Sequence, residues 1–102
     1  MSLAQLAKQR PPVARALYKL KNEVFREGAL TVREKELIAV ALSTLLKCET
    51  CVEFHADKAK DAGATQEELR EALDVVLYMA GPTSLIWSPV VDDITGESEE
   101  ES

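Results

Sequence analysis

The sequence has little of what marks membrane, secreted and nucleic-acid-binding proteins. No apolar run approaches the roughly 20 residues that a membrane-spanning helix requires. Residues 1–10 contain no sustained apolar stretch of the kind found in a secretory signal. The chain has 12 Lys and Arg against 18 Asp and Glu, a formal net charge of -6. Because nucleic acids and anionic membranes are bound by basic surfaces, we expect neither as a partner. Since neither a membrane span nor a secretory signal is visible, we expect a cytoplasmic protein.

Cysteine and histidine are equally scarce. The two cysteines are Cys48 and Cys51, and the single histidine is His55. Structural disulfides are rare in the reducing cytoplasm, and a bridge that closes so short a loop constrains the unfolded chain little. The cysteine pair is therefore expected to carry chemistry instead of stabilising the fold.

What the 102 residues do contain is helical periodicity, and their number suits one domain. Apolar residues recur at spacings of three and four, and no segment alternates convincingly as a strand would. The pattern predicts an all-α fold of about five helices, at residues 12–27, 31–46, 48–62, 65–80 and 84–91. The helical domain is expected over residues 1–94, and the glutamate-rich residues 95–102 are expected to form an acidic disordered tail.

Particular residues predict where these helices begin and end. Two Thr-x-x-Glu capping boxes predict two starts, and two glycines predict two ends: Thr31/Glu34, Thr65/Glu68, Gly28 and Gly63. Pro89 is expected to break or kink the last segment. Helices 31–46 and 65–80 are too apolar for so small a bundle to cover, and residues 85–87 add to the excess. Since a contiguous exposed apolar surface usually marks an interface, we expect a homo-oligomer.

Cys48, Cys51 and His55 fall on one helical stripe. At about 100° per residue, Cys51 lies roughly 60° from Cys48, and His55 roughly 40° from Cys51. The two sulfurs can therefore form a disulfide, and the imidazole is expected to reach the second sulfur. Cys48 is expected at the start of its helix, where free N–H groups and the helix dipole stabilise a thiolate, the reactive form of the thiol.

Glu36 is the fourth candidate site residue. If its helix packs antiparallel on the cysteine helix, its carboxylate is expected to orient His55 or to accept its proton. Two alternatives use the same residues. Two cysteines, His55 and Glu36 are formally a zinc ligand set, although three ligands on one helical stripe fit a disulfide better than a tetrahedron. The second alternative is a non-catalytic oligomeric scaffold that senses redox state through the disulfide.

The pattern Glu36, eleven residues, Cys48-x-x-Cys51 and His55 four residues later resembles the signature of AhpD-like alkylhydroperoxidases in the carboxymuconolactone decarboxylase superfamily. The resemblance covers roughly residues 30–87. It implies an all-helical fold assembled as homotrimers or homohexamers. It also implies reduction of a peroxide or disulfide substrate through the cysteine pair, without a metal or organic cofactor. The lactone decarboxylase proper is a weaker match, because it lacks the redox cysteine pair.

The resemblance further implies a role for each residue. Glu36 and His55 would relay protons, and Cys51 would attack the peroxide. Cys48 would resolve the sulfenic acid and exchange with a thiol reductant protein. AhpD carries a second histidine immediately before the second cysteine, where this chain has Thr50, which does not relay protons at neutral pH.

Overall fold

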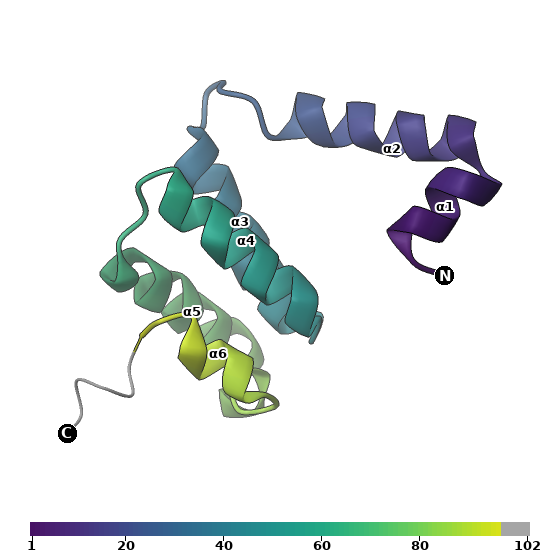
Figure 1. Cartoon of the computed structure of the whole chain (residues 1–102). Helices are drawn as coiled ribbons and strands as arrows, with labels where there is room; N and C mark the ends of the chain where they lie inside the picture. The colour runs from purple at the N-terminus through teal and green to yellow at the C-terminus, as the bar shows by residue number, and fades with distance from the viewer. Residues whose placement is uncertain (97–102) are drawn as a thin grey trace.

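The computed structural model describes residues 1–96, within which all regular structure is helical. The α-helices are α1 (Leu3–Gln9), α2 (Pro11–Val24), α3 (Val32–Leu45), α4 (Glu49–Asp61), α5 (Gln66–Ala80) and α6 (Pro89–Asp93), and Pro82–Ser84 forms a 3-10 turn, η1 (Figure 1). The all-α fold is confirmed. None of the helices in this described part is both long and apolar enough to cross a membrane.

Helices α3 and α4 form the centre of the molecule. They pack against each other, α5 packs on α3, and the short α6 packs on α4 (Figure 1). The buried apolar cluster between these elements consists of Val40, Val52, Ala56, Ala59, Leu69, Leu73, Val91 and Ile94. Two of its α4 members are alanines, whose small side chains let neighbouring helices approach closely. The register of α4 on α3 is therefore set by close packing.

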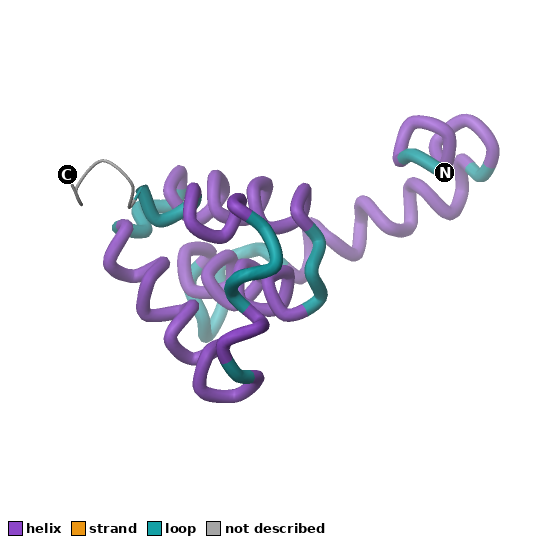
Figure 2. Tube along the Cα trace, turned by 90° about the horizontal axis from the view of Figure 1, so that it is seen from below, coloured by secondary structure: helices purple, strands orange, loops and turns teal. Residues whose placement is uncertain are grey.

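Helices α1 and α2 form an arm that projects from this bundle, as both views show (Figures 1 and 2). Neither helix contains a buried residue. The arm is attached at the end of α2, where Lys35 donates its Nζ proton to the carbonyl of Arg26 at 2.6 Å and Glu27 accepts the N–H of Val32 at 3.1 Å. The apolar stripe of α2 is exposed in the single chain and consists of Val13, Leu17, Leu20 and Val24.

The predicted helix starts at the capping boxes are confirmed. The hydroxyl of Thr31 accepts the N–H of Glu34, and the hydroxyl of Thr65 accepts the N–H of Glu68. Gly63 follows α4 with a φ of 99°, a left-handed conformation that glycine adopts without the steric cost other residues meet. These boundaries follow from local chemistry alone, which explains why the sequence reveals them.

Other boundaries differ from the predictions. The first predicted helix ends at Val24 with Phe25 as its C-cap, so Gly28 lies in the following loop. Helix α1 was not predicted, although Ser2 and Gln5 form a capping box at its start. With seven residues, α1 is too short to show the repeated apolar period by which the other helices were recognised.

The predicted last helix at residues 84–91 is wrong. Residues 85–88 form a turn, and Pro89 begins α6 instead of breaking a helix. Proline suits the first helical position because the N–H it lacks has no partner there. Ser88 caps the helix by accepting the N–H of Val90 at 3.2 Å.

In the single chain the bundle leaves part of the apolar surface of α3 uncovered, as the sequence predicts for residues 31–46. Ile38, Leu42 and Leu45 are about half exposed, whereas Val40 and Thr44 are fully buried. Helix α5 likewise exposes Val75, Tyr78 and Met79. Of residues 85–87 only Ile86 is exposed, because its two neighbours pack on the core.

The predicted acidic tail at residues 95–102 falls mainly outside the described residues, which end at Gly96. Thr95 is buried, and its carbonyl accepts a hydrogen bond from Arg70 at 3.2 Å. The bundle thus holds the chain at least as far as this residue.

The capping boxes predict how stability depends on acid. Hydrogen bonds from Thr31, first its N–H and then its hydroxyl, lower the pKa of Glu34, and the N–H of Thr65 chiefly lowers that of Glu68. A carboxyl whose pKa is lowered by folding stabilises the fold above its unfolded value, 4.5 here, and this contribution is lost as the pH falls through the folded value. We therefore expect the Glu34→Gln/Glu68→Gln variant to unfold at lower urea concentration than the wild type at neutral pH.

The difference should shrink when the same urea titrations are made well below the usual carboxyl pKa. Glu71→Gln, which changes an exposed carboxylate on α5, is the control and should match the wild type throughout. A difference that is independent of pH would contradict the assignment to the capping carboxylates.

Candidate functional site

A tight turn between α3 and α4 places the first cysteine. Lys47 has a φ of 58°, in the left-handed region that non-glycine residues enter only where the surrounding structure holds them. The turn is held by two backbone hydrogen bonds, from Lys47 N–H to the carbonyl of Thr44 and from Cys48 N–H to that of Ser43, each 3.1 Å long. Cys48 is consequently the N-cap of α4, as predicted.

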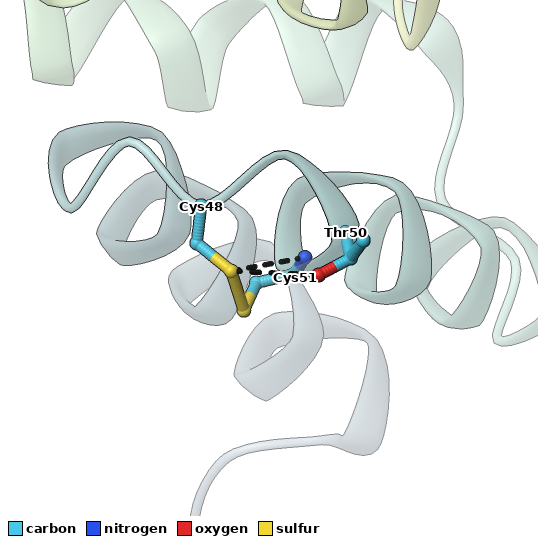
Figure 3. Close-up of a disulfide and its surroundings, with 3 residues drawn as sticks. All are labelled: Cys48, Thr50 and Cys51. Atoms are coloured by element: carbon cyan, nitrogen blue, oxygen red, sulfur yellow. Dashed lines mark hydrogen bonds between the residues drawn. A yellow bond between two sulfur atoms is a disulfide. The ribbon is translucent and has the colours of Figure 1, made fainter. Parts of the chain in front are cut away.

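The two cysteines are joined by a disulfide across the first turn of α4, with their Cα atoms 5.2 Å apart (Figure 3). The Sγ of Cys48 also accepts the N–H of Cys51 at 3.3 Å and lies 3.7 Å from the hydroxyl of Thr50. Thr50 is exposed and both cysteines are partly exposed. The pair can therefore cycle between dithiol and disulfide at a site that solvent reaches.

Glu36 and His55 form a hydrogen bond between α3 and α4. Oε1 of Glu36 lies 2.7 Å from Nδ1 of His55, and the side chains are 7% and 20% exposed. Because a carboxylate only accepts hydrogen bonds, Nδ1 donates to it, and Nε2 keeps its lone pair when the ring is neutral. The structure thus brings together two predicted site residues that are 19 positions apart, in the arrangement of an oriented base.

His55 and the disulfide lie on the same helix, α4, but no hydrogen bond connects them in the described part of the chain. His55 is one turn beyond Cys51. No group of three or more His, Cys, Asp and Glu side chains in this part of the chain has the geometry to hold a metal ion. The four residues of the alternative zinc site are accordingly not gathered around one point here.

An aromatic cover over His55 was missed by sequence reasoning. Phe25, at the end of the arm, stacks on the imidazole with ring centroids 5.6 Å apart, and Phe54 meets it edge-on at 5.1 Å. Lys21 and Lys58 place their Nζ atoms over the Phe54 ring at 5.0 and 5.5 Å. The contact of Phe54 with the imidazole could have been predicted, because Phe54 directly precedes His55. The contact of Phe25 has no signal in the sequence, because it depends on where the end of α2 lies relative to α4.

Glu49, an exposed residue in the first turn of α4, has a partner in the carboxyl-terminal part of the bundle. The hydroxyl of Ser88, the N-cap of α6, donates to the Glu49 carboxylate. The residue that follows Cys48 is therefore linked to the carboxyl-terminal part of the bundle. Capping explains the site of Ser88, but nothing in the sequence signals its contact with Glu49.

Comparison with known proteins identifies the family. A sequence model of the carboxymuconolactone decarboxylase family matches residues 11–87, which includes all four site residues. The chain belongs to the carboxymuconolactone decarboxylase family. The resemblance inferred from Glu36 and the cysteine helix is thus confirmed. An uncharacterised protein of the cox locus of Paracoccus denitrificans is 36% identical, covering 79% of this chain and 77% of that protein.

Solved structures of family members share the fold. A carboxymuconolactone decarboxylase family protein from Legionella pneumophila superposes with a TM-score of 0.82 at 34% identity, covering 96% of this chain and 85% of that one. A family protein from Thermotoga maritima, suggested to take part in an antioxidative response, superposes with a TM-score of 0.72 at 31% identity, covering 85% and 90%.

The aromatic cover predicts how accessible His55 is. Phe25→Ala removes the stacked ring, so the imidazole should react faster with diethyl pyrocarbonate, by several-fold in rate. The readout is clear because the chain has one histidine. Phe25→Leu, which keeps an apolar side chain of similar bulk, is the matched control and should fall between the two. Equal rates in all three proteins would show that Phe25 does not shield the ring.

Proposed function

We propose that this protein is a thiol-disulfide antioxidant enzyme, which reduces peroxides or protein disulfides through Cys48 and Cys51. The observation that carries the proposal is a solvent-accessible disulfide at a helix start, one turn from a histidine that a buried glutamate orients. The cycle uses a dithiol and a disulfide, and an external thiol reductant protein restores the dithiol. The protein needs no resident metal or organic cofactor for these steps.

His55 and Glu36 serve this chemistry as a proton relay. Only a thiolate attacks a peroxide or a disulfide, so each turnover must remove protons from the thiols and deliver them to the departing groups. An imidazole ring can accept a proton at one nitrogen and pass it on, and the Glu36 carboxylate holds the ring in one tautomer. Thr50 stands where AhpD has a further histidine, so the relay here consists of two residues.

Turnover assays with site variants test the proposal. Hydrogen peroxide, an organic hydroperoxide and a small aromatic disulfide serve as oxidants, with dithiothreitol as the electron donor. Cys48→Ser and Cys51→Ser should each abolish turnover while circular dichroism shows an unchanged helical fold. His55→Ala should lower the rate at neutral pH by about 100-fold or more, and Glu36→Gln by about tenfold or more.

Glu53→Gln is the control, because Glu53 is an exposed acid on the same helix. Its rate should equal that of the wild type. No turnover with any of the three oxidants, together with an oligomeric state that changes on oxidation, would instead support the redox-sensing scaffold. One equivalent of zinc bound to the purified protein would contradict the thiol cycle.

We further propose that the arm seats on a second copy of the chain, giving a homo-oligomer of three or six subunits in the cytoplasm. An isolated helix of 14 residues is marginally stable in water, so α2 needs a partner for its apolar stripe. The bundle offers exposed apolar residues on α3 and α5. Charges support the match: residues 1–31 carry six Lys or Arg and two acids, whereas residues 32–96 carry six and twelve.

Light scattering after size exclusion tests this assembly. Leu17→Asp/Leu20→Asp places two charges on the apolar stripe of α2 and should yield monomers, because a buried unpaired carboxylate is costly. Asn22→Asp adds a charge to the opposite face of the same helix and should leave the assembly intact. A wild-type protein that is monomeric at micromolar concentration would overturn the proposal, and binding of the arm to anionic vesicles instead would identify a different partner.

A further inference from the structure

The two sulfurs of the site have different surroundings. The Sγ of Cys48 receives the N–H of Cys51 at 3.3 Å and faces the Thr50 hydroxyl at 3.7 Å (Figure 3). A disulfide sulfur carries no proton, so Cys48 is the acceptor in both contacts. No hydrogen bond within residues 1–96 ends on the Sγ of Cys51. The two donors that reach a sulfur at this turn are therefore both directed at Cys48.

Reduction of the disulfide makes this difference important. A hydrogen bond to a charged acceptor is stronger than one to a neutral acceptor. The start of a helix also favours negative charge, and Cys48 is the N-cap of the 13-residue α4. Once the bond is reduced, the same two donors stabilise a thiolate at Cys48 more than one at Cys51.

We infer that Cys48, not Cys51, is the attacking sulfur of this protein, and that Thr50 is the positioning residue that holds its thiolate. The inference rests on the proposed thiol chemistry and gives its direction. The resemblance to AhpD-like proteins implies that Cys51 attacks a peroxide, whereas this inference assigns the attack on a disulfide substrate to Cys48. It also gives a role to Thr50, the position where this chain departs from AhpD.

The bond changes follow in two steps. The Cys48 thiolate attacks one sulfur of a substrate disulfide, forms a mixed disulfide and releases the other substrate sulfur as a thiolate, which takes up a proton. Cys51 then loses its proton to His55, attacks the Sγ of Cys48 and displaces the second substrate thiolate, which receives that proton. Two electrons pass from the protein dithiol to the substrate, and an external dithiol returns them.

The charged neighbours of Cys48 do not account for the difference between the sulfurs. Lys47 precedes it and Glu49 follows it, so one charge of each sign flanks the residue. The Glu49 carboxylate is engaged by Ser88 at the start of α6. Asp93 of α6 lies near Glu53 and Asp57, which are further along α4 than Cys48. The residues of α3 bonded to this turn are uncharged, namely Ser43 and Thr44.

Single-cysteine variants test which sulfur attacks. Cys51→Ser leaves Cys48 alone, and Cys48→Ser leaves Cys51 alone. Each is titrated by the ultraviolet absorbance of the thiolate and by its rate of reaction with Ellman's reagent, an aromatic disulfide. The protein that retains Cys48 should form its thiolate at lower pH. In mildly acidic buffer it should react about tenfold faster, because a difference of about one unit between the two titration midpoints changes the thiolate fraction tenfold. A faster reaction of the protein that retains Cys51 would overturn the inference.

Two Thr50 variants in the Cys51→Ser background test the positioning role. Thr50→Val removes the hydroxyl but keeps the branched shape, so thiolate formation at Cys48 should move to higher pH and the reaction should slow several-fold. Thr50→Ser retains a hydroxyl and should restore the original pH profile. Identical profiles for the valine and serine variants would remove Thr50 from the mechanism.

These measurements separate the inference from the proposed function. Ellman's reagent reacts stoichiometrically with one thiol, so the comparison needs no catalytic turnover. A protein without turnover still reveals which sulfur is more reactive, and that result would count against the proposed function alone. An active enzyme whose Cys51 reacts faster would count against the order of attack alone.

Discussion

The close packing of α4 on α3 is the constraint on which the site depends. Val40 of α3 and Val52, Ala56 and Ala59 of α4 are almost completely buried, so the helices are held in one register. That register brings the Glu36 carboxylate to His55. A buried carboxylate without a partner is costly, so the imidazole also makes the position of Glu36 tolerable. Core packing and the hydrogen bond between Glu36 and His55 therefore support each other.

The start of α4 shows how a reactive group is built into a structural position. Helices α3 and α5 begin with threonine capping boxes, whereas α4 is capped by the sulfur of Cys48. Sulfur is a weak hydrogen-bond acceptor, so this cap stabilises the helix less than an oxygen would. The same geometry directs donors at the sulfur that must carry charge. Local stability is thus lower at the position where chemistry needs the unusual residue.

The arm formed by α1 and α2 links the proposed contact between subunits to His55 of the candidate site. Its helices bury nothing within one chain, but its last aromatic residue, Phe25, covers His55. A change in how α2 is held would therefore reach the imidazole through one side chain. The carboxyl-terminal elements make a comparable link, because Ser88 at the start of α6 binds Glu49 between the cysteines.

The sequence by itself determined the features that depend on local geometry. Helical periodicity gave the α-class, the capping boxes gave the starts of α3 and α5, and the three- and four-residue spacings placed Cys48, Cys51 and His55 on one stripe. These features require only the geometry of a single helix. The packing of the Glu36 helix against the cysteine helix was only a hypothesis, because the sequence of one helix does not show which helix it packs on.

The tertiary structure decided everything that depends on two elements meeting. It paired Glu36 with His55, laid Phe25 over the ring, joined Ser88 to Glu49 and turned residues 85–88 so that Pro89 begins a helix. It also directed the Thr50 hydroxyl and the Cys51 N–H at one sulfur, through a turn that holds Lys47 in the left-handed region. Such contacts arise from packing between distant segments, and packing is a property of the whole chain instead of any local pattern.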